Sequence, residues 1–328
     1  MVHDGRVLHL EICAPAALTD AVVDVLAADD AVTSLTVQRG AALRPVGDLV
    51  SADVPREAAN AILQRVFETG VQEQGSVRVL PVPTWVSRPA FDAMVEAPGA
   101  STDAIVWPQV VQRAYDDTEL TWTFLAFMTM ATLIAGIAIV LDSQVLIIGA
   151  MVLGPEFGAI AALGVALLRR RRTLLQQAVR TLVVGFTLAI TATTLAGLVG
   201  RALGWVESSD LLAPGRATAF VYTPDRWSLI VSVIAGIAGV LSLTSGRTEA
   251  LAGVFISVTT IPAAANAGLA VAFGLWSEVG GSSLQLAVNI SGMALAGWGT
   301  LWLRQTVWRR LGTRRRVPRR PSDDPRGA

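Results

Sequence analysis

The sequence predicts an α-helical polytopic membrane domain of six spans, with a candidate 3+3 inverted repeat, preceded by a small α+β ferredoxin-like soluble domain. Hydrophobic residues make up 52% of the 328 residues and charged residues only 16%. The mean hydropathy is +0.53, which is typical of a membrane protein. Short strand-like and helix-like segments alternate in the first part of the chain, and apolar segments long enough to cross a bilayer follow.

Charge divides the chain in the same way, although the net charge is zero. Residues 1–118 contain 8 Arg and 16 acidic residues, and the remainder contains 18 Arg and 10 acidic residues. An acidic soluble domain followed by a membrane domain with basic margins explains this division. Nucleic-acid binding requires basic residues clustered on a soluble surface, so we expect no nucleic-acid partner.

Residues 1–84 predict the order β-α-β-β-α-β, the ferredoxin-like or split-βαβ arrangement. The periodicity of the apolar residues and the Pro and Gly positions separate its elements. The predicted strands are 6–12, 32–39, 48–54 and 76–82, and the predicted helices are 15–30 and 55–70. The fold alone does not choose a function, and we expect a cytoplasmic regulatory or oligomerising module.

No metal site or cofactor is predicted. Cys13 is the one cysteine, which excludes a disulfide framework and a thiolate zinc site. His3 and His9 lie near it, and His9 is either a metal ligand or, as we prefer without a ligand-spacing motif, an ordinary strand histidine. No span combines a nucleophile with a base at helical spacing, so we do not expect an enzyme.

Residues 85–119 predict a linker with an amphipathic helix. In DAIVWPQVVQRAYDDTE (103–119), four apolar residues fall on one side of a helix, namely Val106, Val110, Val111 and Ala114. Trp107 and Tyr115 suit a membrane–water boundary. The alternative is a helix packed on the soluble domain.

Six segments contain the roughly 20 apolar residues that a membrane helix needs. They form a membrane domain at 120–303, with spans at 120–141, 144–168, 174–200, 227–245, 249–275 and 283–303. RRRR (169–172) follows the second span, and a tail at 304–328 with nine Arg follows the sixth. Under the positive-inside rule, we expect both the N- and the C-terminus to lie on the cytoplasmic side of the membrane. The tail either contacts anionic lipid or only fixes the orientation.

Two similar hexapeptides indicate an internal repeat, GIAIVL (136–141) and GIAGVL (236–241). Each precedes a glycine-rich span with one proline, at 149–167 and at 253–273. Three spans per repeat give the two halves opposite orientations, as in the inverted repeats of secondary transporters. A chance match between small-residue segments is the alternative.

The segment GPEFG (154–158) is the centre of the predicted site. Proline lacks a backbone donor and clashes with the preceding turn, so Pro155 and Pro262 predict interrupted spans. Freed carbonyl groups and the dipole ends of broken helices attract ions. Gly154 and Gly158 permit sharp turns and close backbone approach. Alternatively, the prolines only kink the helices and the glycines only pack them.

Glu156 is the one carboxylate well inside a predicted span. A charge at that depth costs at least about 2.5 kcal/mol on insertion scales. Burial disfavours the charged form, which makes Glu156 a candidate proton carrier or cation ligand, or else a structural partner of Arg180 or of a backbone amide. The other predicted binding residues are Thr259, Thr260, Asn266 and Asn289. For Asn289, a hydrogen bond between helices is the simpler interpretation. Asp142 and Arg180 are the candidate gate or ion pair.

Several motifs carry a family resemblance. They are DVPREAANAIL (53–63), DDTELTWTF (116–124), LDS (141–143), the proline-centred break (149–158) and AVNISGMALAG (287–297). With these motifs the chain resembles the uncharacterised hydrophobic-domain family of prokaryotic membrane proteins, a domain-of-unknown-function family. The resemblance implies a multi-pass location in a prokaryotic plasma (inner) membrane but no activity. Many family members have Ser-Pro followed by Gly-Pro at the break, and the fifth span often has two adjacent prolines. This chain instead has Gly154-Pro155-Glu156 at the break and Pro262-Ala263 in the fifth span.

These features predict a membrane transporter or channel for a small solute or ion, with its site at broken helices near the bilayer midplane. The cytoplasmic domain would regulate or assemble it. The alternative is a membrane-anchored sensor or assembly scaffold without transport. The expected partners are membrane lipid, the solute or ion, and further copies of the chain, because small-residue faces and this soluble fold both favour homo-oligomers.

Overall fold

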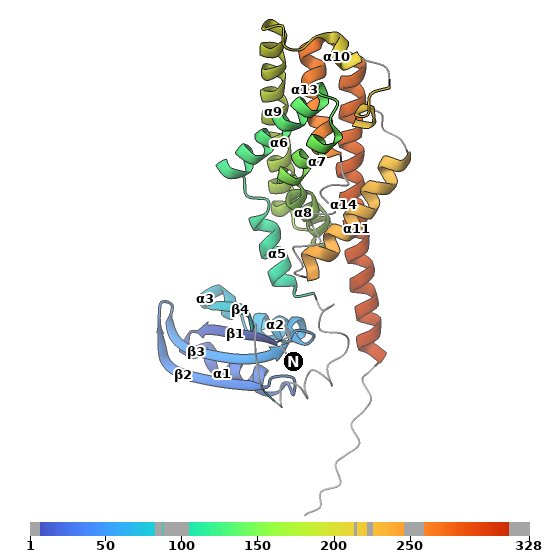
Figure 1. Ribbon diagram of the computed structural model, residues 1–328. Coiled ribbons are helices and arrows are strands. Elements are labelled where there is room, and N and C mark those ends of the chain that lie inside the picture. Colours follow the sequence, from blue (N-terminus) through green and yellow to red (C-terminus); the bar gives the residue numbers. More distant parts are fainter. Residues whose placement is uncertain are drawn as a thin grey trace, which may run out of the picture. The chain divides into compact units, whose positions relative to one another are not determined.

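A computed structural model describes residues 7–82, 87, 105–212, 215–221, 226–245 and 259–314 (Figure 1). The chain divides into two compact units. The first comprises Met1–Gln109 and Gln305–Ala328, and the second comprises Val110–Arg304. His3, residues 88–104 of the predicted linker and residues 315–328 of the predicted tail lie outside the described residues.

The first unit contains a four-stranded antiparallel sheet. Its strands are β1 (Val7–Ala14), β2 (Ser34–Leu43), β3 (Val46–Pro55) and β4 (Ser76–Val82), in the order β2-β3-β1-β4. Helix α1 (Ala16–Ala27) follows β1 and α2 (Ala59–Glu68) follows β3, so the observed elements follow the predicted order. A short helix that was not predicted, α3 (Val71–Gln74), begins after Gly70, whose φ of 77° suits glycine.

One face of the sheet carries the core of this unit. Successive strand residues point to opposite faces, and alternate residues of β1 and β3 are buried. Both helices contribute to the same cluster, so both cover the same face of the sheet. The largest fully buried side chains of the cluster are Leu8, Leu10, Ile12, Leu26, Ile62 and Leu63.

The β2–β3 hairpin extends beyond the predicted strands because a bulge lets the strands pair again after it. The register shifts between residues 38 and 42, where Gly40 has a φ of 66°. The buried carboxylate of Asp48 accepts hydrogen bonds from the Gly40 amide at 2.8 Å and from Arg39 at 3.0 Å. The bonds from Gly40, Thr19 and Arg39 hold the pKa of Asp48 below its ordinary value.

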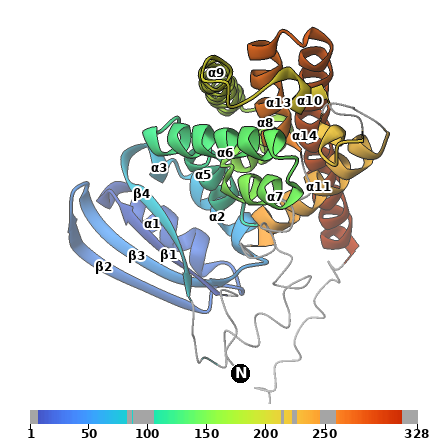
Figure 2. The same ribbon diagram turned by 45° about the horizontal axis from the view of Figure 1, so that its top comes forward.

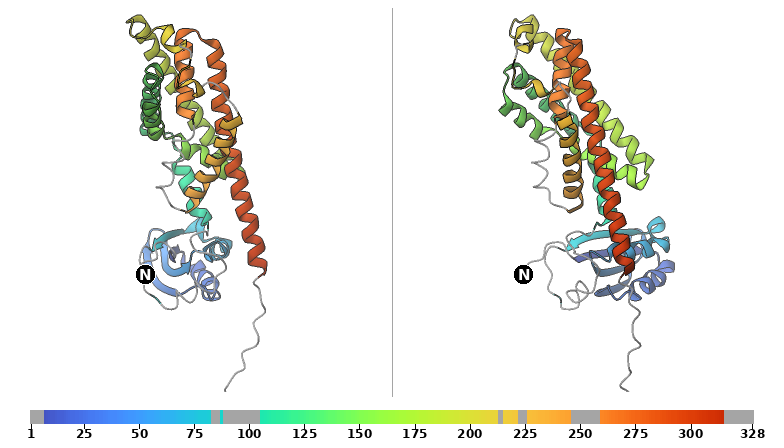
Figure 3. Two further views of the ribbon diagram at one scale, coloured as in Figure 1. Left: turned by 45° about the vertical axis from the view of Figure 1, so that its right-hand side comes forward. Right: turned by 90° about the vertical axis from the view of Figure 1, so that its right-hand side faces the viewer.

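The second unit is helical. It contains α6 (Trp122–Val140), α7 (Gln144–Leu153), α8 (Glu156–Arg169), α9 (Arg172–Ala202), α10 (Ser208–Leu212), η2 (Ala219–Val221), α11 (Arg226–Ser245), α13 (Thr260–Phe273) and α14 (Trp276–Arg314) as far as Arg304. Helix α5 (Trp107–Asp116) precedes it, as the amphipathic pattern predicts. Helices α6 and α7 lie side by side (Figure 2), and α13 lies along the N-terminal part of the continuous α14 (Figure 3).

The number of candidate spans differs from the prediction. Four described helices are long and apolar enough to cross a membrane: α6, α9, Arg226–Thr244 of α11 and Trp276–Val307 of α14. The second predicted span is a pair, α7 and α8, bent by 57°, and it gives a fifth if the pair counts as one span. The prediction of six spans is not confirmed, because residues 249–258 lie outside the described residues and α13 has only 14 residues.

Helix α13 is the buried centre of the second unit. All of its residues except Val271 are buried, as expected for a helix that is apolar all round. It packs against α6 and α9. The Thr194 hydroxyl of α9 donates a hydrogen bond to the Gly268 carbonyl at 3.0 Å, and Arg201 donates to the Ala272 carbonyl at 3.2 Å. The C-terminal ends of α9 and α13 therefore lie together.

Glycine brings α11 and α8 close to α14. A Cβ added to Gly236 of α11 would lie 2.5 Å from the Met293 carbonyl oxygen of α14. A Cβ added to Gly164 of α8 would lie 3.0 Å from the Trp298 nitrogen of the same helix. These contacts involve backbone atoms, which cannot rotate away as a side chain can, so the packing requires small residues.

We expect Gly236→Val to destabilise the second unit by about 1–3 kcal/mol, the usual effect of overpacking. Its added atoms would meet the α14 backbone. Gly149→Val is the matched control, because Gly149 lies on the exposed side of α7 with nothing within 4 Å of an added Cβ. Thermal unfolding of the full chain in detergent measures both. Equal melting temperatures for the two variants would contradict this packing.

We expect Asp48→Asn to remove part of the acid sensitivity of the first unit. A carboxyl group whose pKa is lowered in the folded state stabilises the fold above its unfolded pKa of about 3.9, and this contribution is lost as the pH falls through the folded pKa. Thermal unfolding of the full chain between pH 7 and pH 3 tests this. The control is Asp24→Asn, on the exposed side of α1, and an unchanged pH profile for Asp48→Asn would refute the assignment.

Candidate functional site

The candidate site lies at the break between α7 and α8. Pro155 is the N-cap residue of α8, with φ −89° and ψ 0°, and a helix start requires no backbone donor there. The Gly154 amide donates a hydrogen bond to the Met151 carbonyl at 3.4 Å, which satisfies one carbonyl of the last turn of α7. The break therefore places a new helix N-terminus inside an apolar unit.

Glu156 is the first residue of α8 and is only 6% exposed. Its Oε1 accepts a hydrogen bond of 2.7 Å from the hydroxyl of Thr260, the first residue of α13. Two helix N-termini, which carry positive partial charge, therefore meet at one carboxyl group. An added Cβ at Gly154 would overlap Glu156 Oε2 and would lie 2.8 Å from Ile261 Cγ1. Glycine at 154 makes room for the carboxyl group.

No basic side chain pairs with Glu156 in the described part of the chain. Its Oε2 is buried there without a hydrogen-bond partner. Arg180, one predicted partner, is exposed on α9 and takes part in none of the ion pairs found among the described residues. A buried carboxyl group with no basic partner is costly, and a bound proton, cation or hydrogen-bond donor would relieve that cost.

Thr259 connects this junction to α14. It is the N-cap residue of α13, and its Oγ1 accepts hydrogen bonds from the side-chain amides of Gln285 and Asn289, each at 3.0 Å. The Oε1 of Gln285 is buried without a partner among the described residues. Thr259 is thus the common acceptor for two residues of α14, Asn289, which was predicted, and Gln285, which was not.

Pro262 lies in the first turn of α13, where no backbone donor is needed. It therefore does not interrupt the described part of this helix. Residue 258, at which the prediction expected freed carbonyl groups, lies outside the described residues.

Asn266 contacts a second buried carboxyl group. Its side-chain amide donates hydrogen bonds to Glu278 at 3.1 Å and to the Ser282 hydroxyl at 3.0 Å. Glu278 lies in the first turn of α14 and is 8% exposed. Sequence reasoning missed Glu278 because the predicted sixth span began at residue 283, whereas α14 begins at Trp276.

A signal for the missed residues exists in the sequence. Four buried polar residues of α14 are spaced by four, three and four positions, which places them on one face of a helix. They are Glu278, Ser282, Gln285 and Asn289.

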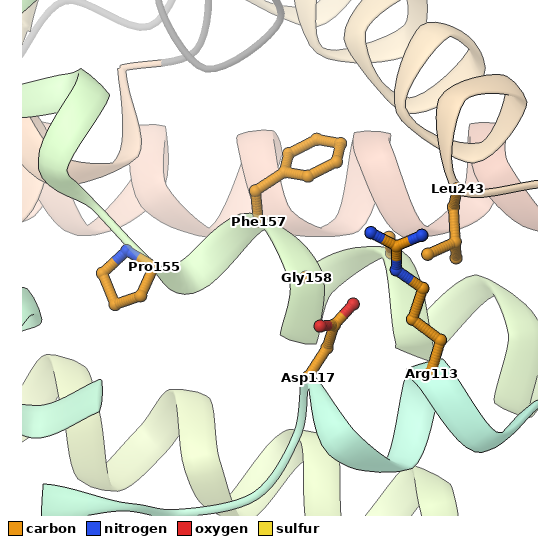
Figure 4. Close-up of a pocket in the computed structure, with 7 residues that line it drawn as sticks. Arg113, Asp117, Pro155, Phe157, Gly158 and Leu243 are labelled. Atoms are coloured by element: carbon orange, nitrogen blue, oxygen red, sulfur yellow. The ribbon is translucent and has the colours of Figure 1, made fainter. Parts of the chain in front are cut away.

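A hollow of about 200 Å³ opens beside the break (Figure 4). Its lining residues are Arg113, Asp117, Pro155, Phe157, Gly158, Ala161 and Leu243. The side chains of Arg113 and Asp117 extend toward α8 (Figure 4), and an added Cβ at Gly158 would lie 2.9 Å from Asp117 Cβ. Burial raises the pKa of Asp117, and the nearby charge of Arg113 opposes this shift. The hollow touches the residues on both sides of Glu156.

Asp142 belongs to a different place, the turn between α6 and α7. Its carboxylate accepts hydrogen bonds from the Ala217 amide at 3.1 Å and from the Thr218 amide and hydroxyl at 3.0 and 2.8 Å. The bonds from Thr218 and Ala217 lower its pKa. Its ion-pair partner, at 3.9 Å, is Arg216, and the predicted pairing with Arg180 is not observed in the described part. Asp142 anchors the segment before η2 to the end of α6.

Other titratable residues form no metal cluster in the described ranges. No three His, Cys, Asp or Glu side chains are grouped as a metal site would need. His9 of β1 lies opposite Asp53 of β3, with Nδ1 at 2.7 Å from the carboxylate. Cys13 is a free thiol on the same strand.

Comparison with known proteins finds a similarity to a family of unknown function. Residues 151–295 match the family described as "Domain of unknown function (DUF389)". An uncharacterized protein of Methanocaldococcus jannaschii is 24% identical over 199 residues, which cover 59% of this chain and 59% of that protein. The match thus spans less than two thirds of that relative. No solved structure matches. The predicted resemblance to an uncharacterised family is confirmed, and the matched range contains the break, α13 and the four polar residues of α14.

We expect Thr260→Val to lower the stability of the second unit by about 1–2 kcal/mol, the upper range for hydrogen bonds inside membrane proteins. Valine keeps the shape of threonine but cannot donate to Glu156 Oε1. Thr260→Ser retains the hydroxyl and should stay close to the wild type. Thermal unfolding in detergent compares the three proteins. A valine variant as stable as the serine variant would show that this hydrogen bond contributes nothing.

Proposed function

We propose that this protein, a relative of that uncharacterised family, is a membrane transporter or channel for a small solute or ion that binds at the junction of α8 and α13. One observation carries the proposal. A buried carboxyl group lies where two helices begin, has one oxygen without a partner in the described part of the chain, and forms no ion pair there. A purely structural carboxyl group at such a position would be expected to have both oxygens satisfied.

A membrane location is supported by the surface of the second unit as well as by helix length. The candidate spans expose many large apolar side chains. Exposed tryptophans lie near the ends of these spans, as in the aromatic belts of membrane proteins. They are Trp122, Trp205, Trp227 and Trp276.

The proposed orientation has both termini in the cytoplasm of a prokaryotic cell. The four arginines at 169–172, between α8 and α9, are all exposed, which suits a cytoplasmic turn in contact with anionic lipid. We further propose the ferredoxin-like arrangement for the first unit, since its antiparallel order β2-β3-β1-β4 suits a split βαβ fold. It would serve as a regulatory or assembly domain of a homo-oligomer.

The inverted repeat is part of the proposal. Helix α8 follows a break in the first half and α13 begins the described part of the fifth predicted span in the second half, and each has 14 residues. Their N-termini meet at Glu156 and Thr260. Broken helices from two inverted halves meeting at one site are a recurrent plan of secondary transporters. The hollow beside Pro155 and Phe157 would give a solute access to this site from one side.

We expect Glu156→Gln to abolish pH-dependent flux, because glutamine keeps the size of the side chain but cannot exchange a proton or carry a negative charge. The full-length protein is reconstituted into liposomes containing a pH-sensitive dye. Flux is recorded under pH, Na⁺ and K⁺ gradients, and then with a panel of small metabolites.

The matched control is Glu119→Gln, an exposed carboxylate in the turn before α6, which should transport as the wild type does. Equal flux in the Glu156→Gln variant and the wild type would refute this site. If the wild type moves none of these solutes while the N-terminal domain of the full chain binds a ligand, the sensor or scaffold function is favoured instead.

A further inference from the structure

The polar face of α14 runs from the start of that helix to the α8–α13 junction. Glu278, Ser282, Gln285 and Asn289 are each no more than 8% exposed. Eleven positions separate the first from the last, which corresponds to about 16 Å of helix. This is roughly half of the 30 Å hydrocarbon thickness of a bilayer. In an apolar unit, such a face is buried only where another element supplies polar partners.

Helix α13 supplies those partners in two places. Asn266 donates hydrogen bonds to Glu278 and Ser282, and Thr259 accepts them from Gln285 and Asn289. The residue after Thr259 is Thr260, which donates to Glu156. We call these polar residues of α13 and α14, from Glu278 to Thr260, the α13–α14 seam. The seam consists of three hydrogen-bonded groups, and it places hydroxyl and amide groups between the buried carboxyl groups of Glu278 and Glu156.

The seam leads away from the hollow beside the break. The hollow lies near the N-terminal part of α9, since the carbonyl of Thr118, next to Asp117, accepts a hydrogen bond from Thr181 at 2.7 Å. Glu278 instead lies just after α13, whose last turn contacts Arg201 near the C-terminal end of α9. Helix α9 is 31 residues long, which corresponds to about 45 Å. The hollow and the seam therefore reach the junction from opposite ends of the unit.

The charges along the seam favour a cation. Glu156 and Glu278 are buried, and neither has an ion pair among the described residues. The buried arginine of this unit in the described ranges is Arg216, which donates to the Leu211 and Ile139 carbonyls instead.

Near the Glu278 end of the seam, the charged residue that α9 contributes is Arg201. Its guanidinium donates to the Ala272 carbonyl and lies 5.6 Å from the centre of the Phe273 ring. Arg201 therefore interacts with the last turn of α13, and it forms no ion pair with Glu278 among the described residues. Two buried acids without a basic partner leave a negative interior that a proton or a sodium ion would neutralise and that would repel an anion.

An unpartnered acceptor within the seam points to the same class of ligand. Gln285 Oε1 is buried and has no hydrogen-bond donor in the described part of the chain, although the amide nitrogen of the same side chain is bonded to Thr259. A seam that served only to hold α13 against α14 would be expected to satisfy this oxygen as well. An open neutral oxygen between two carboxyl groups suits a passing monovalent cation or a protonated water.

We propose that the α13–α14 seam is a path for a monovalent cation, H⁺ or Na⁺, with Glu278 as the cation-binding carboxylate at its start and Glu156 at its end. This rests on the proposed transport function and names the ion that drives or accompanies it. Transport would then use the seam from one end of the unit and the hollow from the other.

Ion-driven flux of the full-length protein in proteoliposomes tests the path in two arms, a Na⁺ gradient at constant pH and a pH gradient without Na⁺. The arm in which the wild type is active identifies the ion. In that arm Glu278→Gln should reduce flux to that of protein-free liposomes, Glu278→Asp should retain flux, and Glu207→Gln, an exposed carboxylate beyond α9, should equal the wild type. A merely structural Glu278 would lower thermal stability without loss of ion-driven flux.

Two outcomes separate this inference from the proposed function. Full flux in Glu278→Gln with loss of flux in Glu156→Gln would overturn the seam and leave the transport site standing. Absence of flux in the wild type would overturn both.

A measurement on the wild type covers the case in which Glu278→Gln does not fold. A membrane-soluble carbodiimide modifies protonated carboxyl groups in apolar surroundings. We expect modification of Glu278, found by mass spectrometry of the peptides, to slow when Na⁺ is added or when the pH is raised. Absence of modification, or modification insensitive to both, would overturn the seam.

Discussion

Inside an apolar helical unit, a buried polar group is out of reach of bulk water and has to find its hydrogen-bond partner within the protein or in a bound ligand. Glu156 meets this constraint only in part, because Thr260 donates a hydrogen bond to its Oε1 while its Oε2 has no partner among the described residues. The bond requires that α8 and α13 both begin at the same point. It also requires glycine at 154, because any larger side chain would occupy the space of the carboxyl group. The break in the second candidate span, the burial of α13 and the polar face of α14 all meet at this bond.

The two prolines contribute to this arrangement in a different way from the one their chemistry first suggests. A proline in the middle of a helix frees a carbonyl group, and such carbonyl groups are potential ion ligands. Here Pro155 is a helix N-cap and Pro262 lies in a first turn, positions where a missing donor costs little. The Met151 carbonyl at the end of α7 is satisfied by the Gly154 amide. At this junction, the described side-chain atoms that are buried without a hydrogen-bond partner are the oxygens Glu156 Oε2 and Gln285 Oε1.

The polar residues of the second unit fall into two kinds, which their partners distinguish. Asp142 has both oxygens engaged by the Ala217–Thr218 segment and is close to Arg216, so it ties one segment to another. Glu156 and Glu278 have only neutral side-chain partners among the described residues, and Glu156 keeps one oxygen open. The contacts of Asp142 stabilise a turn at the end of a helix. Burying Glu156 and Glu278 without a basic partner lowers the stability of the fold, so these two carboxyl groups indicate a ligand-binding role.

Local sequence pattern determined the order of elements in the first unit, the apolar class of the second, and the break at GPEFG. These depend on periodicity and on the backbone chemistry of proline and glycine, which act within a few residues. The pattern also marked Glu156, because a carboxylate in an apolar segment is conspicuous. It could not reveal that Thr260 is the partner of Glu156, 104 residues away, or that Gly40 lets the β2–β3 hairpin pair beyond its bulge. It placed the start of α14 too late, which left Glu278 and Ser282 outside the predicted sixth span, and it did not single out Gln285 within that span, although the spacing of the three residues is helical. Only the tertiary structure decided which polar residues share a junction, because hydrogen bonds between distant helices depend on packing that no short segment encodes.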